Sequence, residues 1–244
     1  MLNQNSITVV VTTFNSSSHV EKTIESVLNQ SIKVKKMIFI DDNSEDIKQL
    51  EKKLLQIQTV YKEFYFDLIH NNQNKGPGFS RNLGWSKVNT EFVAFLDCDD
   101  SWEIDKLEKQ LNIFKIHNDL SLVATAKDKK INNFKTGIVT INMMLFRNLV
   151  PLSSVLIKSD ISYRFSERYY SEDYNLWLDL LFNDLKIFII NDVLCSENNI
   201  PQRKKLSSNY FSMSAETQKT LSKFFFKKNY YFFWIILAKI FEII

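Results

Sequence analysis

Short apolar runs alternate with helical patterns along the first half of the chain, and this alternation is the strongest constraint on its fold. The runs are rich in β-branched and aromatic residues and lie at 7–11, 36–40, 64–70 and 92–97. Helical spacing follows the first three, and Ser18 and Glu21 are spaced as a capping box before the first helix. Strands that are apolar on both faces and joined through helices form parallel sheets with right-handed crossovers. We therefore predict an α/β protein with a doubly wound, mainly parallel, Rossmann-like sheet.

The second half of the chain is less regular. Short strands are expected near 121–125, 153–158 and 186–190, around the acidic loop-to-helix stretch "SEDYNLWLDLLF". With 244 residues and 45% hydrophobic content, the chain can bury one full core. We expect one domain over 1–215 and a helical C-terminal tail over 216–244.

Composition excludes several partners and compartments. The formal net charge is +3, from 31 basic and 28 acidic residues, so nucleic acid is not an expected partner. Two cysteines cannot form a disulfide framework, and the first residues lack the pattern of a secretory signal, which together favour the cytoplasm. No apolar run reaches the roughly 18 residues that span a bilayer.

The tail mixes aromatic residues with lysines, a combination suited to a membrane surface. Its longest apolar run, 230–244, carries Lys239 and Glu242. The tail is expected either to lie on a membrane surface or to dock on the protein's own apolar surface, and both alternatives stay open.

Acidic residues crowd the ends of two predicted strands. Asp97, Asp99 and Asp100 follow one strand in "FLDCDDSW", and Asp41 and Asp42 end another. Ligands of such sheets lie beyond the carboxyl ends of the strands, so both clusters are expected at one rim. Carboxylates that share a site repel one another, and a divalent cation with oxygen ligands, Mn²⁺ or Mg²⁺, would neutralise them. The alternative is that these aspartates only cap turns and helices.

Other phosphate-binding motifs are missing from the sequence. The chain has only 4 glycines, with no Walker-type phosphate loop and no dinucleotide-binding glycine motif after the first strand. ATPase and dinucleotide-binding functions are therefore not expected.

Five stretches resemble, in order and spacing, the family 2 glycosyltransferases, which have the GT-A fold. They are "VVVTTFNSSSHVEKTIESVLNQS", "IDDNSED", "NKGPGFSRNLG", "FLDCDDSW" and "SEDYNLWL". Members of this family move a sugar from a nucleotide-sugar donor to an acceptor hydroxyl, usually with inversion at the anomeric carbon. The resemblance implies a metal-dependent, inverting glycosyltransferase with a GT-A type sheet.

The resemblance also implies which residues bind the nucleotide sugar. They are Thr12, Thr13, Phe14, Asn15, Asp42, Arg81, Asp97 and Cys98. Phe14 stands where the family often has Tyr, so stacking on the base is kept and a hydroxyl contact is lost; the alternative is a core aromatic. Arg81 can pair with phosphate or carboxylate, and the alternative is a solvated arginine on a helix face. Cys98 fills the variable middle position of the motif, and its thiol is expected to pack inertly.

A metal ion and a catalytic carboxylate complete the implied site. Asp99 would hold Mn²⁺ or Mg²⁺, while Asp97 would face the ribose and the sugar. Asp173 is implied as the catalytic base. Without the resemblance, Glu172 and Asp173 are better explained as N-caps of a helix, whose dipole favours ionised carboxylates.

Further residues are implied in supporting parts of the site. They are Asp41, Gly76, Asp100, Trp102, Glu172 and Arg203. Asp41 is expected as a buried strand end, and Gly76 and Gly78 as positions where the backbone turns tightly near the ligand. Asp100 is expected to cap the next turn or to join the site through water. Arg203 only faintly echoes the segment that closes the site in the family.

The implied donor is a nucleoside diphosphate sugar, a UDP-sugar first of all, and the implied acceptor is a saccharide or a lipid-linked saccharide. The implied pathway is assembly of a bacterial surface polysaccharide (capsule, lipopolysaccharide or O-antigen) at the inner face of the membrane. Two alternatives stay open. One is a nucleotidyltransferase on a similar core, which would release pyrophosphate, and the other is a non-catalytic scaffold that keeps the fold.

Overall fold

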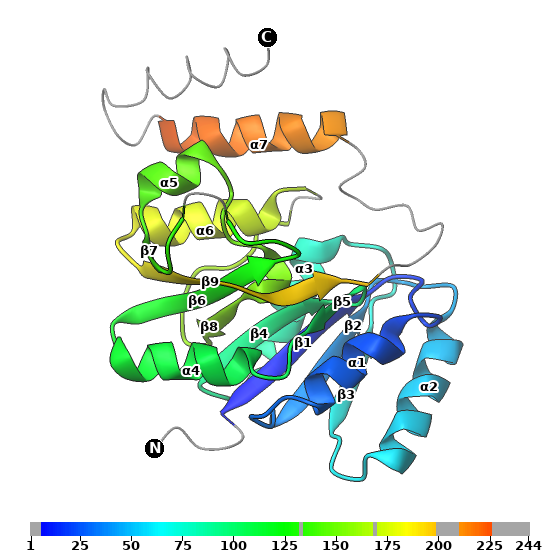
Figure 1. Ribbon diagram of the computed structural model, residues 1–244. Coiled ribbons are helices and arrows are strands. Elements are labelled where there is room, and N and C mark those ends of the chain that lie inside the picture. Colours follow the sequence, from blue (N-terminus) through cyan, green and yellow to red (C-terminus); the bar gives the residue numbers. More distant parts are fainter. Residues whose placement is uncertain (1–5, 132–133, 168–169, 199–209, 226–244) are drawn as a thin grey trace.

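A nine-stranded sheet forms the centre of the computed structural model, which describes residues 6–131, 134–167, 170–198 and 210–225 (Figure 1). Eight strands follow the order β3-β2-β1-β4-β8-β6-β9-β5, and β7 pairs with β9 outside that order. The strands are β1 Ile7–Thr13, β2 Lys36–Asp41, β3 Phe66–His70, β4 Phe92–Asp97, β5 Asp100–Trp102, β6 Leu120–Lys127, β7 Gly137–Val139, β8 Leu156–Lys158 and β9 Lys186–Glu197. The chain winds from β1 outwards to β3 and then places β4 on the other side of β1, with all four strands parallel. This confirms the doubly wound arrangement predicted for the first half.

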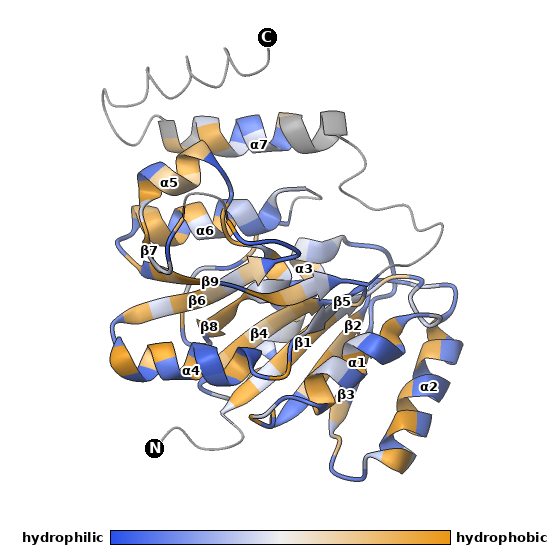
Figure 2. Ribbon diagram, in the orientation of Figure 1, coloured by the Kyte–Doolittle hydropathy of each residue, from blue (hydrophilic) through white to orange (hydrophobic). Residues whose placement is uncertain are grey.

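Helices cover both faces of the sheet. They are α1 Val20–Leu28, α2 Ile47–Val60, α3 Pro77–Ser86, α4 Lys106–Ile116, α5 Ile141–Phe146, α6 Glu172–Phe182 and α7 Tyr210–Phe225, with a 3-10 turn, η1, at Leu152–Ser154. Helices α1, α2 and α4 pack on one face, and α3, α5 and α6 pack on the other, with α7 outside α6 (Figure 1). Because helices cover the sheet on both sides, its strands are apolar and the helices carry their polar residues on the outside (Figure 2).

Two apolar cores lie on opposite faces of the sheet because successive side chains of a strand point to opposite faces. In β1, Ile7, Val9 and Val11 pack in the core beneath α1 and α2, whereas Val10 packs in the core beneath α3 and α6. All four side chains are buried. Burial on both faces explains why the strands read as unbroken apolar runs rather than as alternating ones.

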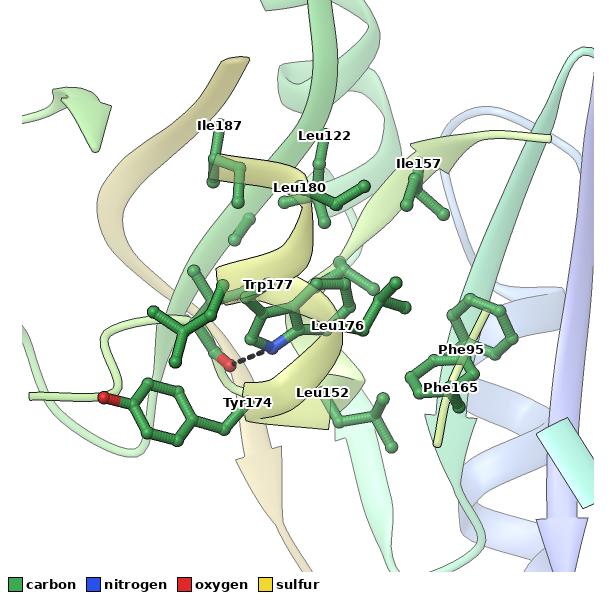
Figure 3. Packing of buried hydrophobic residues seen from close by; sticks show 14 of the residues in the cluster. Phe95, Leu122, Leu152, Ile157, Phe165, Tyr174, Leu176, Trp177, Leu180 and Ile187 are labelled. Carbon is green, nitrogen blue, oxygen red and sulfur yellow. Dashed lines mark hydrogen bonds between the residues drawn. The ribbon is translucent and has the colours of Figure 1, made fainter. Parts of the chain in front are cut away.

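Trp177 anchors helix α6 in the second of these cores (Figure 3). Its side chain is fully buried, and its Nε1 donates a hydrogen bond of 3.1 Å to the carbonyl of Val150. The ring of Phe165 lies between it and β4, with ring centroids 6.0 Å from Trp177 and 4.9 Å from Phe95. This packing fixes where the N-terminus of α6 meets the sheet.

Several details differ from the sequence-based expectation or extend it. Strand β8 runs antiparallel between β4 and β6, so the sheet is mixed in its second half. The capping box predicted at Ser18 and Glu21 is wrong, because α1 begins at Val20 and no side chain caps it. Helix α7 crosses the domain boundary predicted at residue 215, and the tail over 226–244 lies outside the described residues, as does Arg203. Among the helices that are described, none is long and apolar enough to cross a membrane.

Parallel pairing brings the carboxyl ends of β1, β2 and β4 level with one another. Thr12 is in register with Asp97 on one side and with Ile40 on the other, and Thr13 is in register with Asp41. The segments that follow these strands therefore start from one edge of the sheet, which we call the rim. This is the edge at which ligands of such sheets bind.

Helix α3 approaches the segment before α6 so closely that a side chain at Gly78 would collide with it. An added Cβ would lie 2.1 Å from the carbonyl oxygen of Ser166. We predict that Gly78→Ala lowers the free energy of unfolding by about 1–3 kcal/mol in urea denaturation, because backbone must move to make room. At Gly137 the nearest atom lies at 3.8 Å, so Gly137→Ala should leave stability within about 0.5 kcal/mol. Equal effects of the two changes would contradict the close contact.

Candidate active site

Three carboxylates converge in the turn between β4 and β5, which we call the acidic turn (residues 97–100). Asp97 ends β4 and Asp100 begins β5. Asp97, Asp99 and Asp100 can each place a carboxylate oxygen within 4.8 Å of the others. Because these oxygens repel one another and suit hard cations, the turn has the donor atoms of a Mg²⁺ or Mn²⁺ site.

Asp100 is the buried member of the acidic turn and is 1% exposed. Its Oδ2 pairs with Nζ of Lys127, at the end of β6, at 2.7 Å. Its Oδ1 is buried without a hydrogen bond of normal geometry among the described residues. Burial raises the pKa of Asp100 to about 7, the charge of Asp97 adds to this, and Lys127 and a hydrogen bond from Ser153 oppose it. The oxygens of this carboxylate keep lone pairs that can coordinate a cation.

Arg81 of α3 connects the acidic turn to helix α6. Its Nη2 donates to Oδ1 of Asp97 at 2.9 Å, and its Nη1 pairs with Oε1 of Glu172. The side chain is 5% exposed, so the alternative of a solvated helix-face arginine is wrong. Burial by itself lowers the pKa of Arg81, but the charges of Asp97 and Glu172 outweigh it and raise the pKa. Arg81 thus faces carboxylates of two separate segments at once.

Glu172 and Asp173 are the first two residues of α6, as the sequence predicts. Oδ1 of Asp173 accepts a hydrogen bond of 2.6 Å from the backbone N–H of Tyr174. Burial raises the pKa of Asp173 to about 7; the charge of Glu172 adds to this, and Arg81 opposes it. A carboxyl group with a pKa near neutrality can both take up and release a proton under ordinary conditions.

Asp41 and Asp42 correct the expectation that both acidic clusters need a cation. The Asp41 carboxylate accepts from Thr13, from the backbone and hydroxyl of Ser44, and pairs with Nδ1 of His70 at 2.8 Å. The Asp42 carboxylate accepts from Nδ2 of Asn71 at 2.9 Å and from the backbone N–H groups of 75 and 76 at 2.9 and 2.8 Å. Donors from neighbouring segments therefore satisfy both, and neither depends on an ion.

The loop after β1 presents one exposed ring at the rim. Phe14 is 48% exposed, so the alternative of a core aromatic is wrong. The hydroxyl of Thr12 lies 3.5 Å from Oδ1 of Asp97, on the same side as Arg81. Thr13 is not brought together with them, because its side chain is buried against Asp41. Asn15 has a positive φ of 49° and its Oδ1 accepts from the backbone N–H of residue 45, which ties this loop to the one after β2.

Two supporting residues, Cys98 and Trp102, are buried at the acidic turn, and a third, Gly76, lies in the loop that Asp42 holds. Cys98 is 2% exposed, in agreement with a thiol that packs inertly. Trp102 is 5% exposed, and its Nε1 donates to the carbonyl of Ser153 at 2.6 Å beneath the turn. Gly76 has φ 84°, a conformation that favours glycine, and its N–H is one of the donors to Asp42.

Several residues of the site escaped the sequence analysis. Lys127 pairs with Asp100, and Ser153 accepts from the backbone N–H of Asp97 at 3.1 Å. Lys127 had a usable signal, because it is the first charged residue after the apolar run at 121–126 and so marks the end of a strand at the rim. Ser153 had none, since its partner is 56 positions away along the chain.

The family model for glycosyl transferase family 2 matches residues 8–174. This range includes the acidic turn, Arg81, Asp173 and the loops after β1 and β2. The chain belongs to glycosyl transferase family 2. The match speaks against the nucleotidyltransferase alternative.

Two curated glycosyltransferases share part of the sequence. A UDP-Glc:alpha-D-GlcNAc-diphosphoundecaprenol beta-1,3-glucosyltransferase of Escherichia coli is 28% identical over 213 residues, 84% of this chain and 81% of that protein. The Bacillus subtilis protein TuaG, assigned to teichuronic acid biosynthesis as a glycosyltransferase, is 37% identical over 110 residues. That second match covers 43% of this chain and only 40% of TuaG.

A solved glycosyltransferase structure supports the fold. The mannosyltransferase PcManGT from Pyrobaculum calidifontis, in complex with GDP-Man and Mn²⁺, superposes with a TM-score of 0.72 and 14% sequence identity. The superposition covers 93% of this chain and 66% of the mannosyltransferase. At this identity the likeness concerns the fold, and it confirms the predicted GT-A type architecture.

In this family 2 chain, removal of the Arg81 guanidinium leaves two carboxylates without their cation. We predict that Arg81→Met lowers the free energy of unfolding by about 3–5 kcal/mol in urea denaturation. Lys36→Met is the matched control, because it breaks the more exposed pair of Lys36 with Asp67 at 2.6 Å and should cost less than about 1 kcal/mol. Combining Arg81→Met with Glu172→Gln should restore part of the loss. Strictly additive losses would contradict a direct pairing.

The raised pKa of Asp173 predicts a pH-dependent cost in stability. The folded chain keeps the proton to about pH 7, whereas an unfolded chain releases it near 3.8, so rising pH favours unfolding across this window. Asp173→Asn removes this cost. Its stability relative to the native protein should increase between pH 4 and 7, by up to about 4 kcal/mol, and then level off. Urea denaturation at a series of pH values measures this, and a difference independent of pH would contradict it.

Proposed function

We propose that this chain is an inverting, metal-dependent glycosyltransferase that transfers a sugar from a nucleoside diphosphate sugar to an acceptor hydroxyl. The observation that carries the proposal is the pairing of Arg81 with both Asp97 and Glu172. Through it, the acidic turn and the carboxyl group of Asp173 are held at one place on the rim. The acidic turn can then bind the donor next to the carboxyl group that accepts the proton.

The acidic turn fits a divalent cation. Its donors are carboxylate oxygens, and one of them, Oδ1 of Asp100, is buried without a normal hydrogen bond in the described part of the chain. Asp99 and Asp97, with Asp100 as a third ligand or through water, would hold Mn²⁺ or Mg²⁺. Such an ion, when bound, offsets the charge that builds on a departing diphosphate. The bound Mn²⁺ of the Pyrobaculum mannosyltransferase supports the same assignment.

Asp173 is the proposed catalytic base. Its carboxylate accepts the proton of the acceptor hydroxyl as that oxygen attacks the anomeric carbon from the face opposite the leaving group. A pKa of about 7 suits this part, because the group must be ionised to accept the proton and basic enough to hold it. Glu172 keeps Arg81 against Asp97 and does not itself take the proton. One base is enough for an inverting transfer.

The proposed nucleotide site is lined by Thr12, Asp97 and Phe14. The ring of Phe14 is exposed at the rim and can stack on a base. Asp42 holds the loop 71–76 and is the proposed contact for the edge of the base, with Asn15, Thr13 and Asp41 shaping the loops around it. A UDP-sugar is the proposed donor, in keeping with the UDP-Glc named for the Escherichia coli relative.

The proposed acceptor is a saccharide or a lipid-linked saccharide in bacterial surface polysaccharide assembly. The diphosphoundecaprenol acceptor of the Escherichia coli relative and the teichuronic acid assignment of TuaG support this class. We place the reaction in the cytoplasm, at the inner face of the membrane that carries such lipids. Contact of the tail with that membrane is part of the proposal.

The test separates donor binding from transfer. Thermal unfolding in the presence of UDP, GDP, ADP or CDP with Mn²⁺ should show one nucleotide that raises the melting temperature, because a ligand that binds only the folded state stabilises it. Asp173→Asn should keep that stabilisation and lose at least about a hundredfold of the turnover, measured as nucleoside diphosphate release from the matching sugar donor.

Asp179→Asn is the control, because it makes the same chemical change about two turns further along α6 and should retain activity. Wild-type turnover by Asp173→Asn would overturn the mechanism. A protein that no nucleoside diphosphate stabilises with Mn²⁺ would overturn the donor site.

A further inference from the structure

Helix α1 holds the backbone of the acidic turn from behind. The hydroxyl of Thr23 lies 2.8 Å from the carbonyl oxygen of Cys98 and 2.8 Å from that of Asp100. Thr23 is 0% exposed, and it sits on the opposite face of the sheet from Arg81. A single hydroxyl proton therefore serves two carbonyls on either side of the residue expected to hold the metal.

Asn198, just after β9, holds the carbonyl between those two. Its backbone N–H donates to the carbonyl of Asp99 at 2.7 Å, and its Nδ2 lies 3.4 Å from the hydroxyl of Thr23. Asn198 is 6% exposed. The carbonyls of 98, 99 and 100 are thus all held by two residues that are 175 positions apart along the chain.

Gln30, two residues after the end of α1, holds the chain beyond the acidic turn. Nε2 of Gln30 donates to the carbonyl of Glu103 at 2.7 Å, and Oε1 of Gln30 accepts from the backbone N–H of Leu107 at 3.1 Å. Strand β5 in between pairs with β9, with Asp100 opposite Glu197. The segment from 98 to 107 is therefore fixed at both ends and along one edge.

Holding a carbonyl fixes its peptide plane, and two successive planes fix the direction of the Cα–Cβ bond between them. Three held carbonyls thus set the directions in which Asp99 and Asp100 project. Arg81 and Lys127 offset the charges of Asp97 and Asp100, but an ion pair does not fix the backbone from which a side chain projects. The held carbonyls keep the turn in the conformation that places the three carboxylates within 4.8 Å of one another.

We propose that Thr23, supported by Asn198, is a positioning residue that aims the carboxylates of the acidic turn at a common cation and so sets the affinity of that site. This rests on the proposed metal-dependent function and adds to it a buried side chain on the far face of the sheet. Thr23 touches neither donor nor metal. It acts through the backbone of 98–100.

Thr23→Val tests the proposal, because it keeps the shape of the side chain and removes the hydroxyl. Mn²⁺ binding is followed by electron paramagnetic resonance of the free ion, with the full chain and no nucleotide. We expect Thr23→Val to weaken Mn²⁺ binding about tenfold, as loss of groups that orient metal ligands commonly does. Thr23→Ser, which keeps the hydroxyl, should bind Mn²⁺ as tightly as the native protein.

Thr90→Val is the matched control at the other end of the sheet. The buried hydroxyl of Thr90 also makes two contacts, at 2.8 Å to Thr8 and 2.8 Å to the carbonyl of Phe92, where β4 begins. The variant Thr90→Val should lose thermal stability as Thr23→Val does, and it should keep the native affinity for Mn²⁺. Asn198→Ala, which removes the weaker amide contact, should reduce the affinity by about threefold and serves if Thr23→Val does not fold.

Native Mn²⁺ affinity in Thr23→Val or in Asn198→Ala would overturn the positioning role, as would an equal loss of affinity in Thr90→Val. A native protein that does not bind Mn²⁺ would instead overturn the cation site of the proposed function. Failure of nucleotide binding alone leaves this test intact, because no nucleotide is present.

Discussion

Negative charge at the carboxyl end of the sheet is the constraint on which the rest of the structure depends. The carboxyl groups at the rim are Asp41, Asp42, Asp97, Asp99, Asp100, Glu172 and Asp173. The fold answers them in three ways. N–H and O–H donors satisfy Asp41 and Asp42, which follow β2. Arg81 pairs with Asp97 and Glu172, and Lys127 pairs with Asp100. Burial raises the pKa of Asp173, so that it keeps its proton up to near neutral pH. The three carboxylates of the acidic turn lie within 4.8 Å of one another, and that is why a divalent ion suits this turn better than the aspartates after β2.

Strand geometry divides adjacent residues between two tasks. Successive side chains leave a strand on opposite faces, so neighbours in the sequence meet different partners. Thr12 faces Asp97, whereas Thr13 is buried against Asp41. One residue after Asp41, the carboxylate of Asp42 binds the loop that leads into α3. At each strand end, one side chain therefore points to the candidate site, and the next one makes buried hydrogen bonds that hold the neighbouring loop.

The sequence predicted the elements better than it predicted their partners. The parallel strands, the rim and the helix that begins at Glu172 followed from apolar periodicity and from acidic residues at strand ends, which are local signals. A short strand was expected near 153–158 and β8 lies there, but its antiparallel direction was not predicted, because its neighbours in the sheet lie far away in the sequence. Partners of charged groups were missed for the same reason. The sequence shows that aspartates are crowded at the strand ends, but it does not show which distant residues donate hydrogen bonds to Asp41 and Asp42. Arg81 was assigned to the donor from the resemblance, while its pairing with Glu172 came from the packing of α3 beside α6.

The pairing of β5 with β9 has a consequence for how the molecule is made. Asp100 lies opposite Glu197, so the strand that pairs beside the acidic turn is synthesised nearly a hundred residues after the turn itself. A chain emerging from the ribosome folds from its N-terminus onwards. The first four strands and their helices can collapse early and bring Thr23 to the acidic turn, but β5 lacks its pairing partner until β9 has been synthesised. A truncated or stalled product that ends before β9 would therefore keep the folded first half, with an acidic turn that is held from one side only.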